Sequence, residues 1–583
     1  MNLKFNLNMR FVSLGTAGHV DHGKTTLVKA LTGIDTDRLP EEKRRGMSID
    51  FGFAFLDFPE SNLRVELIDI PGHERFIKNA VAGLSCVKGV LLVVDASEGV
   101  MPQTVDHVRL MASFGIQHCI VVLTKTDKVD TEILSLARIE VEEFLKREGI
   151  HPKCILEVSA LLGTGIDTLK LSIKEYATEL LSLYEEETFF RLCVDSAFLV
   201  KGYGTVVRGS CVSGRIREGD TVVLEPAGVS SRIRRMQNHG AWVKEGKAGE
   251  RLAVNLPEVD VKQVKRGDML VKKGEAIKTR RLIAHVRGKL PEGVKTLFHW
   301  MREVKFRGRR VEESIYLLDL EEPVVAFVGD MGPILDSSGK LCGSYRVLHP
   351  LPIRRSSNFI RQNVDLLTNH LASYMLKEAG VKGVELKRIS SAYGRHVNPQ
   401  KLRAVRVGDK LYDPSVVENL KKRLRDILTK AEYPLHVEEV RSLLGIDQVL
   451  LQFLLEDTKG YRRVEGYILD ETRSDINKLD VFKRLVEYMG DSIKEEKDLQ
   501  EFRDILPVAV RRGVVHSLGA YLYVTDQTLH RMVEKLRGLG SSFSVQDAKT
   551  TLGLTRKYLI PLLEYLDRLG VTRREGDRRF FVR

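Results

Sequence analysis

The stretch Gly18-His19-Val20-Asp21-His22-Gly23-Lys24-Thr25-Thr26 decides the fold of this 583-residue chain. It has the spacing G-x-x-x-x-G-K-[ST], which is typical of a phosphate-binding loop between a strand and a helix. The apolar residues 11–15 predict the strand, and residues 27–31 predict the helix. In such a loop the lysine reaches the β- and γ-phosphates, and the hydroxyl that follows it can bind Mg²⁺. The residues expected around the phosphates are Asp21, His22, Gly23, Lys24, Thr25 and Thr26.

A second motif follows a buried strand predicted over residues 65–70. Asp69 stands at the carboxyl end of this strand, where ligands bind in an open α/β sheet. Its carboxylate can hold Mg²⁺ through a water molecule. Gly72 can offer its N–H to a γ-phosphate only if its loop closes, so it is predicted to sense the triphosphate against the diphosphate.

Two further strand ends predict the binding of a guanine base. Residues 119–123 lead into Thr124, Lys125 and Asp127, and residues 156–158 lead into a turn. Asp127 can accept hydrogen bonds from guanine N1–H and N2–H₂, which adenine lacks, and Lys125 can lie along the base. The turn, whose backbone can reach guanine O6, consists of Ser159, Ala160 and Leu161. The four ordered motifs indicate a GTP- and GDP-binding domain over residues 10–184, because an ATPase gives no account of Asp127.

The residues of these motifs, at 19–26 and 69–73, resemble those of the translation-factor GTPases. In that family the residue at the position of His73 orients the attacking water once the ribosome docks. Residues 45–50 resemble the first switch, which implies that Ser48 supplies a hydroxyl to Mg²⁺ where the family usually has threonine. Thr124 stands where the family usually has asparagine. Because threonine has fewer hydrogen-bonding groups than an amide, we predict weaker bonding near the base and fast nucleotide exchange without an exchange factor.

The composition narrows the possible partners and compartments. A net charge of +13 favours a polyanionic partner. The six cysteines lack metal-ligand or redox spacing, which fits a reducing cytoplasm. No stretch reaches the roughly 20 apolar residues of a membrane span. Residues 1–8 lack the apolar core of a signal peptide. We therefore expect a cytoplasmic protein without a membrane partner, and a monomer.

The middle of the chain is predicted to form two β-barrels, over residues 186–274 and 275–352, because short alternating runs are separated by Gly-rich turns. Residues 195–198 and 201–209 resemble the second domain of translational GTPases, which holds the aminoacyl end of a tRNA. Arg208 and Arg251 fall where the general elongation factor carries uncharged side chains. Two guanidiniums suit an anionic selenolate better than a thiol, whose pKa is about 8.5. With Asp195 they predict a selenocysteine pocket, although Ser196 stands where a basic residue often follows the family's Asp.

The last third of the chain is predicted to repeat one unit. Each unit closes on an apolar strand that bears aromatic residues. Their first aromatics, spaced 55, 54 and 59 positions apart, are Tyr412, Tyr467, Tyr521 and Phe580. Such a period indicates a repeated supersecondary unit, and helices followed by a hairpin fit a winged helix. The four units are predicted over residues 353–415, 416–474, 475–530 and 531–583.

The fourth unit carries a basic cluster on a recognition-type helix and on a hairpin. We expect its members to converge on one face, where guanidiniums can bind phosphates and stack on unpaired bases of an RNA hairpin. This cluster lies at the opposite end of the sequence from the GTPase domain, which is predicted over residues 1–185. The six residues are Arg556, Lys557, Arg573, Arg574, Arg578 and Arg579.

A P-loop α/β domain, two β-barrels and tandem α+β winged helices together resemble the selenocysteine-specific elongation factors of bacteria. The resemblance covers essentially the whole chain. It implies a carrier that delivers selenocysteinyl-tRNA to the ribosome, with GTP and Mg²⁺, and grips an mRNA hairpin beside a recoded stop codon. A general tRNA carrier is the first alternative, and four winged helices argue against it. A DNA-binding regulator with a GTPase switch is the second, and the tRNA-end barrel argues against it.

Overall fold

The structure is a computed structural model. It describes residues 9–37, 40–45, 48–184, 187–288, 290, 295–353, 356–431, 435–458, 460–464, 467–470, 476–503 and 506–582. The amino-terminal residues 1–8 and the switch residues Gly46 and Met47 lie outside the described residues. The chain divides into two compact units, Met1–Val416 and Val417–Arg583. Among the described residues, no helix combines the length and the apolar character that a membrane crossing requires.

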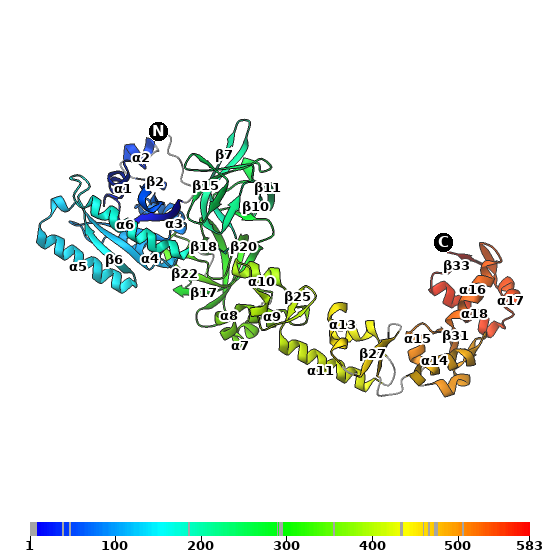
Figure 1. Ribbon diagram of the computed structural model, residues 1–583. Coiled ribbons are helices and arrows are strands. Elements are labelled where there is room, and N and C mark those ends of the chain that lie inside the picture. Colours follow the sequence, from blue (N-terminus) through cyan, green and yellow to red (C-terminus); the bar gives the residue numbers. More distant parts are fainter. Residues whose placement is uncertain are drawn as a thin grey trace. The chain divides into compact units, whose positions relative to one another are not determined.

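The amino-terminal domain contains a six-stranded sheet in the order β2-β3-β1-β4-β5-β6 (Figure 1). All neighbouring strands are parallel except β2, which pairs antiparallel with β3 at the edge. The strands are β1 (Arg10–Ala17), β2 (Gly52–Phe58), β3 (Leu63–Asp69), β4 (Gly89–Asp95), β5 (His118–Thr124) and β6 (His151–Glu157). This arrangement confirms the predicted P-loop α/β domain.

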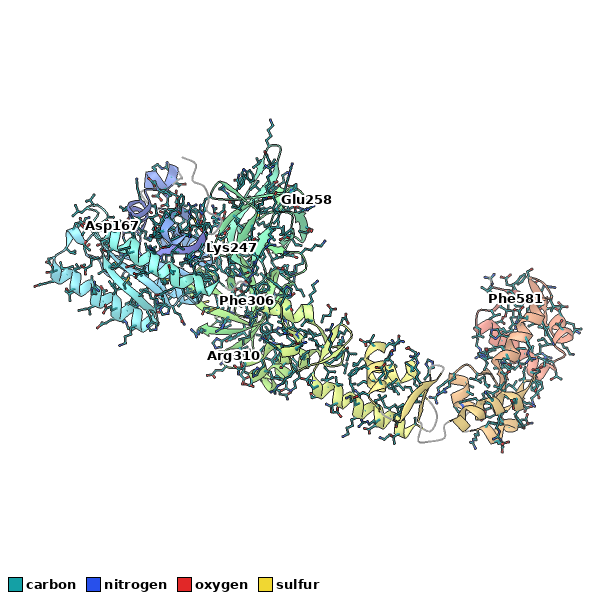
Figure 2. All side chains as sticks on the ribbon, viewed as in Figure 1. Asp167, Lys247, Glu258, Phe306, Arg310 and Phe581 are labelled. Carbon is teal, nitrogen blue, oxygen red and sulfur yellow. The ribbon has the colours of Figure 1, made fainter. Side chains whose placement is uncertain are left out.

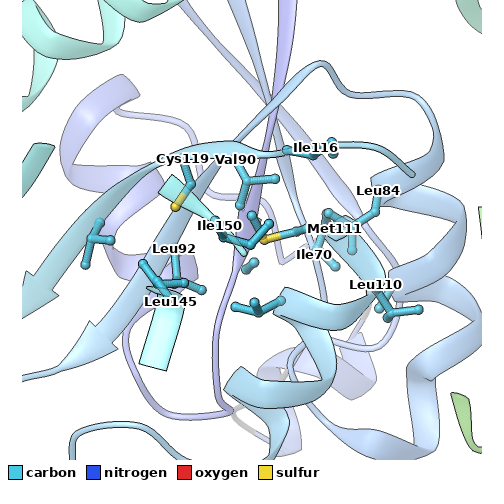
Figure 3. Close-up of a cluster of buried hydrophobic side chains, with 14 of the residues drawn as sticks. Ile70, Leu84, Val90, Leu92, Leu110, Met111, Ile116, Cys119, Leu145 and Ile150 are labelled. Carbon is cyan, nitrogen blue, oxygen red and sulfur yellow. The ribbon is translucent and has the colours of Figure 1, made fainter. Parts of the chain in front are cut away.

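Helices cover both faces of this sheet, so its central strands are almost continuously apolar. One face packs against α3 (Ile77–Ser85), α4 (Pro102–Ser113) and α5 (Thr131–Glu148), and Figure 3 shows part of this core around Val90, Leu110 and Leu145. The other face packs against α1 (Lys24–Thr32) and α6 (Ile166–Leu180). The short helix α2 (Pro40–Arg45) precedes the switch segment. The two cores hold the carboxyl ends of the parallel strands at one edge.

Two β domains follow in the same unit. The first is an eight-stranded antiparallel sheet in the order β11-β10-β16-β7-β8-β15-β12-β13, beside the pair β9–β14. Its strands are β7 (Arg191–Val200), β8 (Gly204–Ser213), β9 (Arg215–Arg217), β10 (Thr221–Glu225), β11 (Val229–Arg232), β12 (Arg235–Asn238), β13 (Ala241–Val243), β14 (Glu245–Lys247), β15 (Arg251–Leu256) and β16 (Met269–Lys272).

The second β domain is a closed barrel, and Phe306, which Figure 2 labels, is buried in it. Its strands are β17 (Lys278–Gly288), β18 (Lys295–His299), β19 (Arg302–Arg310), β20 (Ile315–Val325), β21 (Met331–Leu335) and β22 (Leu341–His349). Closure leaves no sheet edge for another chain to extend.

Four three-stranded sheets with identical strand order follow the barrels, as expected for four winged helices. The first two contain α7 (Ser357–Gln362), α8 (Val364–Asn369), α9 (Leu371–Ala379), β23 (Val384–Glu385), α10 (Leu386–Tyr393), β24 (Val405–Val407) and β25 (Lys410–Tyr412), then α11 (Pro414–Lys430), β26 (Leu435–His436), α12 (Val437–Leu444), α13 (Gln448–Glu456), β27 (Tyr461–Val464) and β28 (Tyr467–Asp470). The last two contain α14 (Ile476–Met489), β29 (Lys494–Glu495), α15 (Leu506–Arg511), β30 (Val515–Gly519) and β31 (Leu522–Thr525), then α16 (Asp526–Arg537), β32 (Ser542–Ser544), α17 (Val545–Leu552), α18 (Arg556–Arg568), β33 (Thr572–Glu575) and β34 (Arg578–Phe581).

Strand register gives the true spacing of the repeat. In each unit the last residue of the first strand pairs with the first residue of the last strand. The residues that begin the last strands are Lys410, Tyr467, Leu522 and Arg578. They lie 57, 55 and 56 positions apart, which is more even than the spacing of the aromatics. Tyr521 belongs to the turn before β31 and Phe580 lies two residues into its own strand pairing, so the aromatics are not equivalent positions.

The third and fourth winged helices share one hydrophobic core. Leu518 and Val524 of the third unit cluster with Phe543, Leu559 and Leu563 of the fourth. Figure 2 labels Phe581, which packs against this cluster. Arg568 also donates a hydrogen bond to the carbonyl oxygen of Leu518 at 3.0 Å. Because α16 begins at Asp526, a fragment that starts near residue 531 would cut through this shared core.

Candidate nucleotide site, aminoacyl pocket and RNA surface

The phosphate-binding loop is shaped by residues with positive φ angles and by hydrogen bonds to two side chains of α4. Gly18 has φ 135°, and a Cβ there would lie 2.1 Å from the carbonyl oxygen of Val93. Its N–H donates to Nδ1 of His107 at 3.0 Å, and the N–H of Val20 donates to Gln103 at 3.0 Å. Burial lowers the pKa of His107 to about 3, so its ring stays neutral and can accept. No sequence motif signalled either side chain.

The next loop residues lead directly into α1. Asp21 is exposed with φ 65°, and Gly23 has φ 83°. His22 is buried with Nε2 3.2 Å from Glu98, while Thr26 is exposed on the first turn of the helix. Left-handed residues at such a turn point successive N–H groups into one concavity, which suits an anion.

Lys24 lies folded over the loop. Its Nζ donates to the carbonyl oxygens of His19 at 2.6 Å and Gly18 at 3.1 Å. Burial lowers the pKa of Lys24 to about 8, against the opposing effect of Asp69. A Cβ on Gly72 would lie 2.4 Å from this Nζ, so the predicted phosphate sensor lies directly against the loop.

The three predicted Mg²⁺ oxygens lie together. The hydroxyls of Thr25 and Ser48 are 3.1 Å apart, and Thr25 donates to Asp69 at 2.7 Å. Adjacent ligands of an octahedral Mg²⁺ with bonds of 2.0–2.1 Å are about 2.9 Å apart, so the two hydroxyl oxygens fit neighbouring ligands of the ion, and the Asp69 carboxylate beside them suits a contact through water. Ser48 also donates to Asp37 at 2.8 Å, and Thr36 donates to Asp69 at 2.7 Å. No sequence motif points to Asp37 or Thr36.

The base-binding side is held by paired side chains. Lys125 has φ 55° and lies 2.7 Å from Asp95, and Ser159 donates to Asp127 at 2.5 Å. Ala160 is half-buried and Leu161 is exposed on the following turn. The hydroxyl of Thr124 donates to the carbonyl oxygens of His22 at 2.8 Å and Val94 at 3.2 Å. Thr124 therefore ties the phosphate loop to the sheet, a role that the comparison with asparagine did not suggest.

His73 directly follows Gly72 and is half-buried. Its Nδ1 accepts a hydrogen bond from the N–H of Arg75 at 3.2 Å, as the N-cap of the short 3₁₀ turn Glu74–Phe76. This bond leaves Nε2 as the ring nitrogen available to a water molecule.

The three residues predicted to form a selenocysteine pocket lie on the adjacent strands β7, β8 and β15, but Arg251 is paired with Asp195. Arg208 and Arg251 share one face of β8 and β15 as diagonal neighbours. Both Nε and Nη2 of Arg251 donate to Asp195 at 3.0 Å, and its guanidinium lies 3.8 Å from the ring centroid of Phe53 in β2. Arg251 is thus paired within the barrel and packed on the GTPase domain. The Arg208 guanidinium lies 4.8 Å from the ring of Phe198.

The expected convergence of the six basic residues in the fourth winged helix is wrong. Register pairs Arg574 with Arg579 on one face of the hairpin, and Arg573 and Arg578 lie on the other face, because strand side chains alternate. Arg579 is only 5% exposed and donates to Asp567 at 2.9 Å, so it belongs to the folded interior.

The other five basic residues are exposed, and several have partners. Lys557 binds Glu495 at 2.5 Å, Arg573 pairs with Glu575, and Arg578 donates to Ser542 at 3.2 Å. Arg574 donates to the carbonyl oxygen of Gly576 near the hairpin tip at 3.2 Å. Arg556 begins α18.

The phosphate loop, the oxygens of Thr25, Ser48 and Asp69 gathered beside it, and the β domain that follows define a GTPase of the translation-factor class. The Elongation factor Tu GTP binding domain family matches residues 9–179, Elongation factor Tu domain 2 matches residues 204–271, and the Elongation factor SelB winged helix matches residues 534–581.

Relatives match over nearly the whole chain. The selenocysteine-specific elongation factor of Desulfomicrobium baculatum is 31% identical over 97% of this chain and 99% of its own length, and that of Escherichia coli (strain K12) is 28% identical over 97% and 98%. The crystal structure of a bacterial selenocysteine-specific elongation factor, EF-Sec, is 45% identical with a TM-score of 0.76, covering 99% of this chain and 100% of that one. The chain belongs to the selenocysteine-specific elongation factor family.

Proposed function

We propose that this GTPase carries selenocysteinyl-tRNA to the ribosome in its GTP- and Mg²⁺-bound form, and holds an mRNA hairpin beside a recoded stop codon. The names of its full-length relatives support the first part. A solved SelB of Methanococcus maripaludis, 29% identical over 59% of this chain and 79% of its own with a TM-score of 0.50, is a complex with the GTP analogue GppNHp.

The observation that carries the proposal is that two arginines of the first β domain contact the segment after Ser48. Arg266 lies 4.5 Å from the ring of Phe51 and donates to Asp50 at 3.3 Å. Arg251 lies 3.8 Å from the ring of Phe53, two residues further along. A change of nucleotide that moves Ser48 would pull on both arginines, and through Arg251 on Asp195. GTP could in this way control the barrel face that receives the aminoacyl end.

The residues divide by role in this proposal. Lys24 and the loop N–H groups would hold the phosphates, with Gly72 as the sensor, and Asp127 would read the guanine. Mg²⁺, held by Thr25 and Ser48 and through water by Asp69, would offset phosphate charge. His73 would orient the attacking water.

We assign the contact with the selenolate to Arg208, because Nε and Nη2 of Arg251 both donate to Asp195. A retention assay of the GTP-bound protein against selenocysteinyl-, seryl- and cysteinyl-tRNA tests this assignment. Arg208→Ala should weaken the binding of selenocysteinyl-tRNA by roughly 10- to 150-fold, the range of a charged hydrogen bond. Seryl-tRNA should stay near its weak level.

Two variants serve as controls in the same assay. Arg215→Ala, an exposed residue of β9, should change nothing. Arg251→Ala should weaken the binding of all three tRNAs alike, because it removes the contact between the first β domain and Phe53 of the GTPase domain. Selectivity lost with Arg251→Ala but kept with Arg208→Ala would contradict the assignment and place the selenolate at Arg251.

Filter binding of the full chain to an RNA hairpin and to duplex DNA of equal length tests the second part. We expect a preference for the hairpin that falls when Arg556 and Lys557 are both replaced by alanine. Equal binding of the two nucleic acids would favour the DNA-binding regulator instead.

A further inference from the structure

The wing of the third winged helix has an unusual turn. Gly519 pairs with Leu522, so Ala520 and Tyr521 form a two-residue turn, and both have positive φ angles of 51° and 58°. Turns of this kind favour Asn, Asp and Gly, because a Cβ is strained there. In the first and fourth wings glycine takes a turn position, at Gly408 with φ 62° and Gly576 with φ 61°. The third wing instead keeps a large side chain in a strained position, a pattern that often marks a functional site.

Packing does not account for this side chain. Tyr521 is 75% exposed, whereas Tyr523, two residues on, is half-buried and donates to Glu496 at 3.4 Å. The carbonyl oxygen of Tyr521 accepts from the N–H of Glu496 at 2.8 Å, so the tip of the wing is held in place while its ring projects.

The wing tip lies beside the start of the recognition helix of the fourth unit. Leu522 pairs with Glu495 in the sheet. The carboxylate of Glu495 in turn accepts from Lys557 at 2.5 Å and from the hydroxyl of Tyr558 at 3.0 Å. Tyr521 is therefore linked to the first turn of α18 through its neighbour Leu522, the strand partner Glu495 and the contact of Glu495 with Lys557. Arg556 is exposed in the same turn. The shared core of the two units keeps this neighbourhood fixed.

We propose that the Tyr521 ring stacks on an unpaired base of the RNA that the start of α18 holds, an inference that rests on the proposed hairpin binding. A flat ring offers stacking to a splayed base, and Arg556 at the start of α18 can meet the adjoining phosphates. Of the two acidic neighbours, Glu495 is paired with Lys557, and the Glu496 carboxylate accepts a hydrogen bond from the Tyr523 hydroxyl. The RNA surface thus spans two winged helices.

The test uses the full chain and the hairpin that follows the recoded stop codon in a selenoprotein message of the same organism. Tyr521→Ala should weaken its binding by roughly 5- to 150-fold, the range for one stacked base. Tyr521→Phe should bind nearly as the wild type. With 2-aminopurine at each unpaired position in turn, one position should be quenched by the wild type and by Tyr521→Phe, but not by Tyr521→Ala.

Glycine variants separate stacking from folding. Tyr521→Gly removes both ring and strain, so it should raise the Tm of the third and fourth units while it weakens RNA binding. Ala520→Gly relieves strain one residue away and should raise the Tm without changing RNA binding. Unchanged binding by Tyr521→Ala, with Arg556→Ala impaired, would overturn this inference alone. A wild-type chain that does not bind the hairpin would overturn the proposed hairpin function as well.

Discussion

The nucleotide site and the fourth winged helix received equally detailed residue predictions, yet the structure treats the two groups differently. Residues from four separate motifs converge at the nucleotide site, with Thr25, Ser48 and Asp69 in hydrogen-bond contact. The four hairpin arginines of the winged helix divide between two faces, and Arg579 is buried. A parallel sheet brings its strand ends to one edge whatever the details, whereas the face of each hairpin residue depends on a register that a count of charges does not contain.

The largest expected effect tests whether convergence at the nucleotide site means catalysis. His73→Ala should lower ribosome-stimulated GTP hydrolysis by roughly 10²-fold or more, the usual loss for a positioning or acid–base group. GTP affinity should not change, because water positioning acts in the transition state. Single-turnover hydrolysis on ribosomes measures the first quantity and nucleotide titration the second. His151→Ala, an exposed histidine on β6, is the matched control, and an unaltered rate with His73→Ala would remove the residue from the mechanism.

The second prediction concerns the two faces of the terminal hairpin. Arg579→Ala should destabilise the fourth winged helix by about 1.5–3 kcal/mol, because it removes a charged hydrogen bond to Asp567 in a buried setting. Arg578→Ala, the exposed neighbour, should cost less than about 0.5 kcal/mol. Thermal unfolding of the two variants measures the difference. Equal stability would mean that the faces are not distinct and that the basic cluster acts as one.

The third prediction uses the pKa of Lys24, which burial lowers to about 8. Bound phosphates favour the charged ammonium, so below about pH 8 the group is charged in both states and GTP affinity should be constant. Above the pKa the free protein has lost this proton and must regain it on binding, so affinity should fall by up to about tenfold per pH unit. Titrations between pH 7 and 9 measure this change.

A variant and the second region provide controls for the pH experiment. Lys24→Arg, whose guanidinium does not titrate, should flatten the decline if the variant binds GTP. Hairpin binding to the arginines of the fourth winged helix should show no such decline over the same range. A flat profile in the wild type would show that Lys24 stays charged in the free loop.

The smallest effect concerns Thr124. Asn at this position should slow GDP release by about 2- to 10-fold, the worth of one ordinary hydrogen bond. Thr124→Val keeps the shape, removes the bond to His22 and should speed release. Stopped-flow GDP dissociation measures both variants. A wild-type release that takes hours would contradict the expected fast exchange.

The GTPase fold and the proximity of Thr25, Ser48 and Asp69 were predictable from short motifs, and the order of the domains from the alternating runs and the repeat. The hydrogen bonds to Gln103 and His107 were not predictable, since these side chains come from a helix 83 or more residues away that carries no motif. The pairing of Arg251 with Asp195 was also missed. Both residues were assigned to one pocket and they lie in contact, but the sequence does not say that one neutralises the other.

The repeat shows a similar boundary. Aromatic residues revealed that four units exist, and their number agrees with the four three-stranded sheets. They did not give the register, because Tyr521 occupies a turn rather than a strand. Nor did they show that the third and fourth units share a core, since long-range packing between repeats leaves no periodic signal.

Ionic strength should separate the two ends of this molecule. The Arg251 guanidinium lies on the Phe53 ring of the GTPase domain, and its pair with Asp195 is largely buried, with side chains 18% and 5% exposed, so dissolved ions screen this contact little. Exposed arginines on the wing instead compete with solution cations for RNA phosphates, and their contact weakens steeply as electrolyte is added. Concentrated electrolyte would therefore strip RNA from the chain while the barrel stays seated on the GTPase domain.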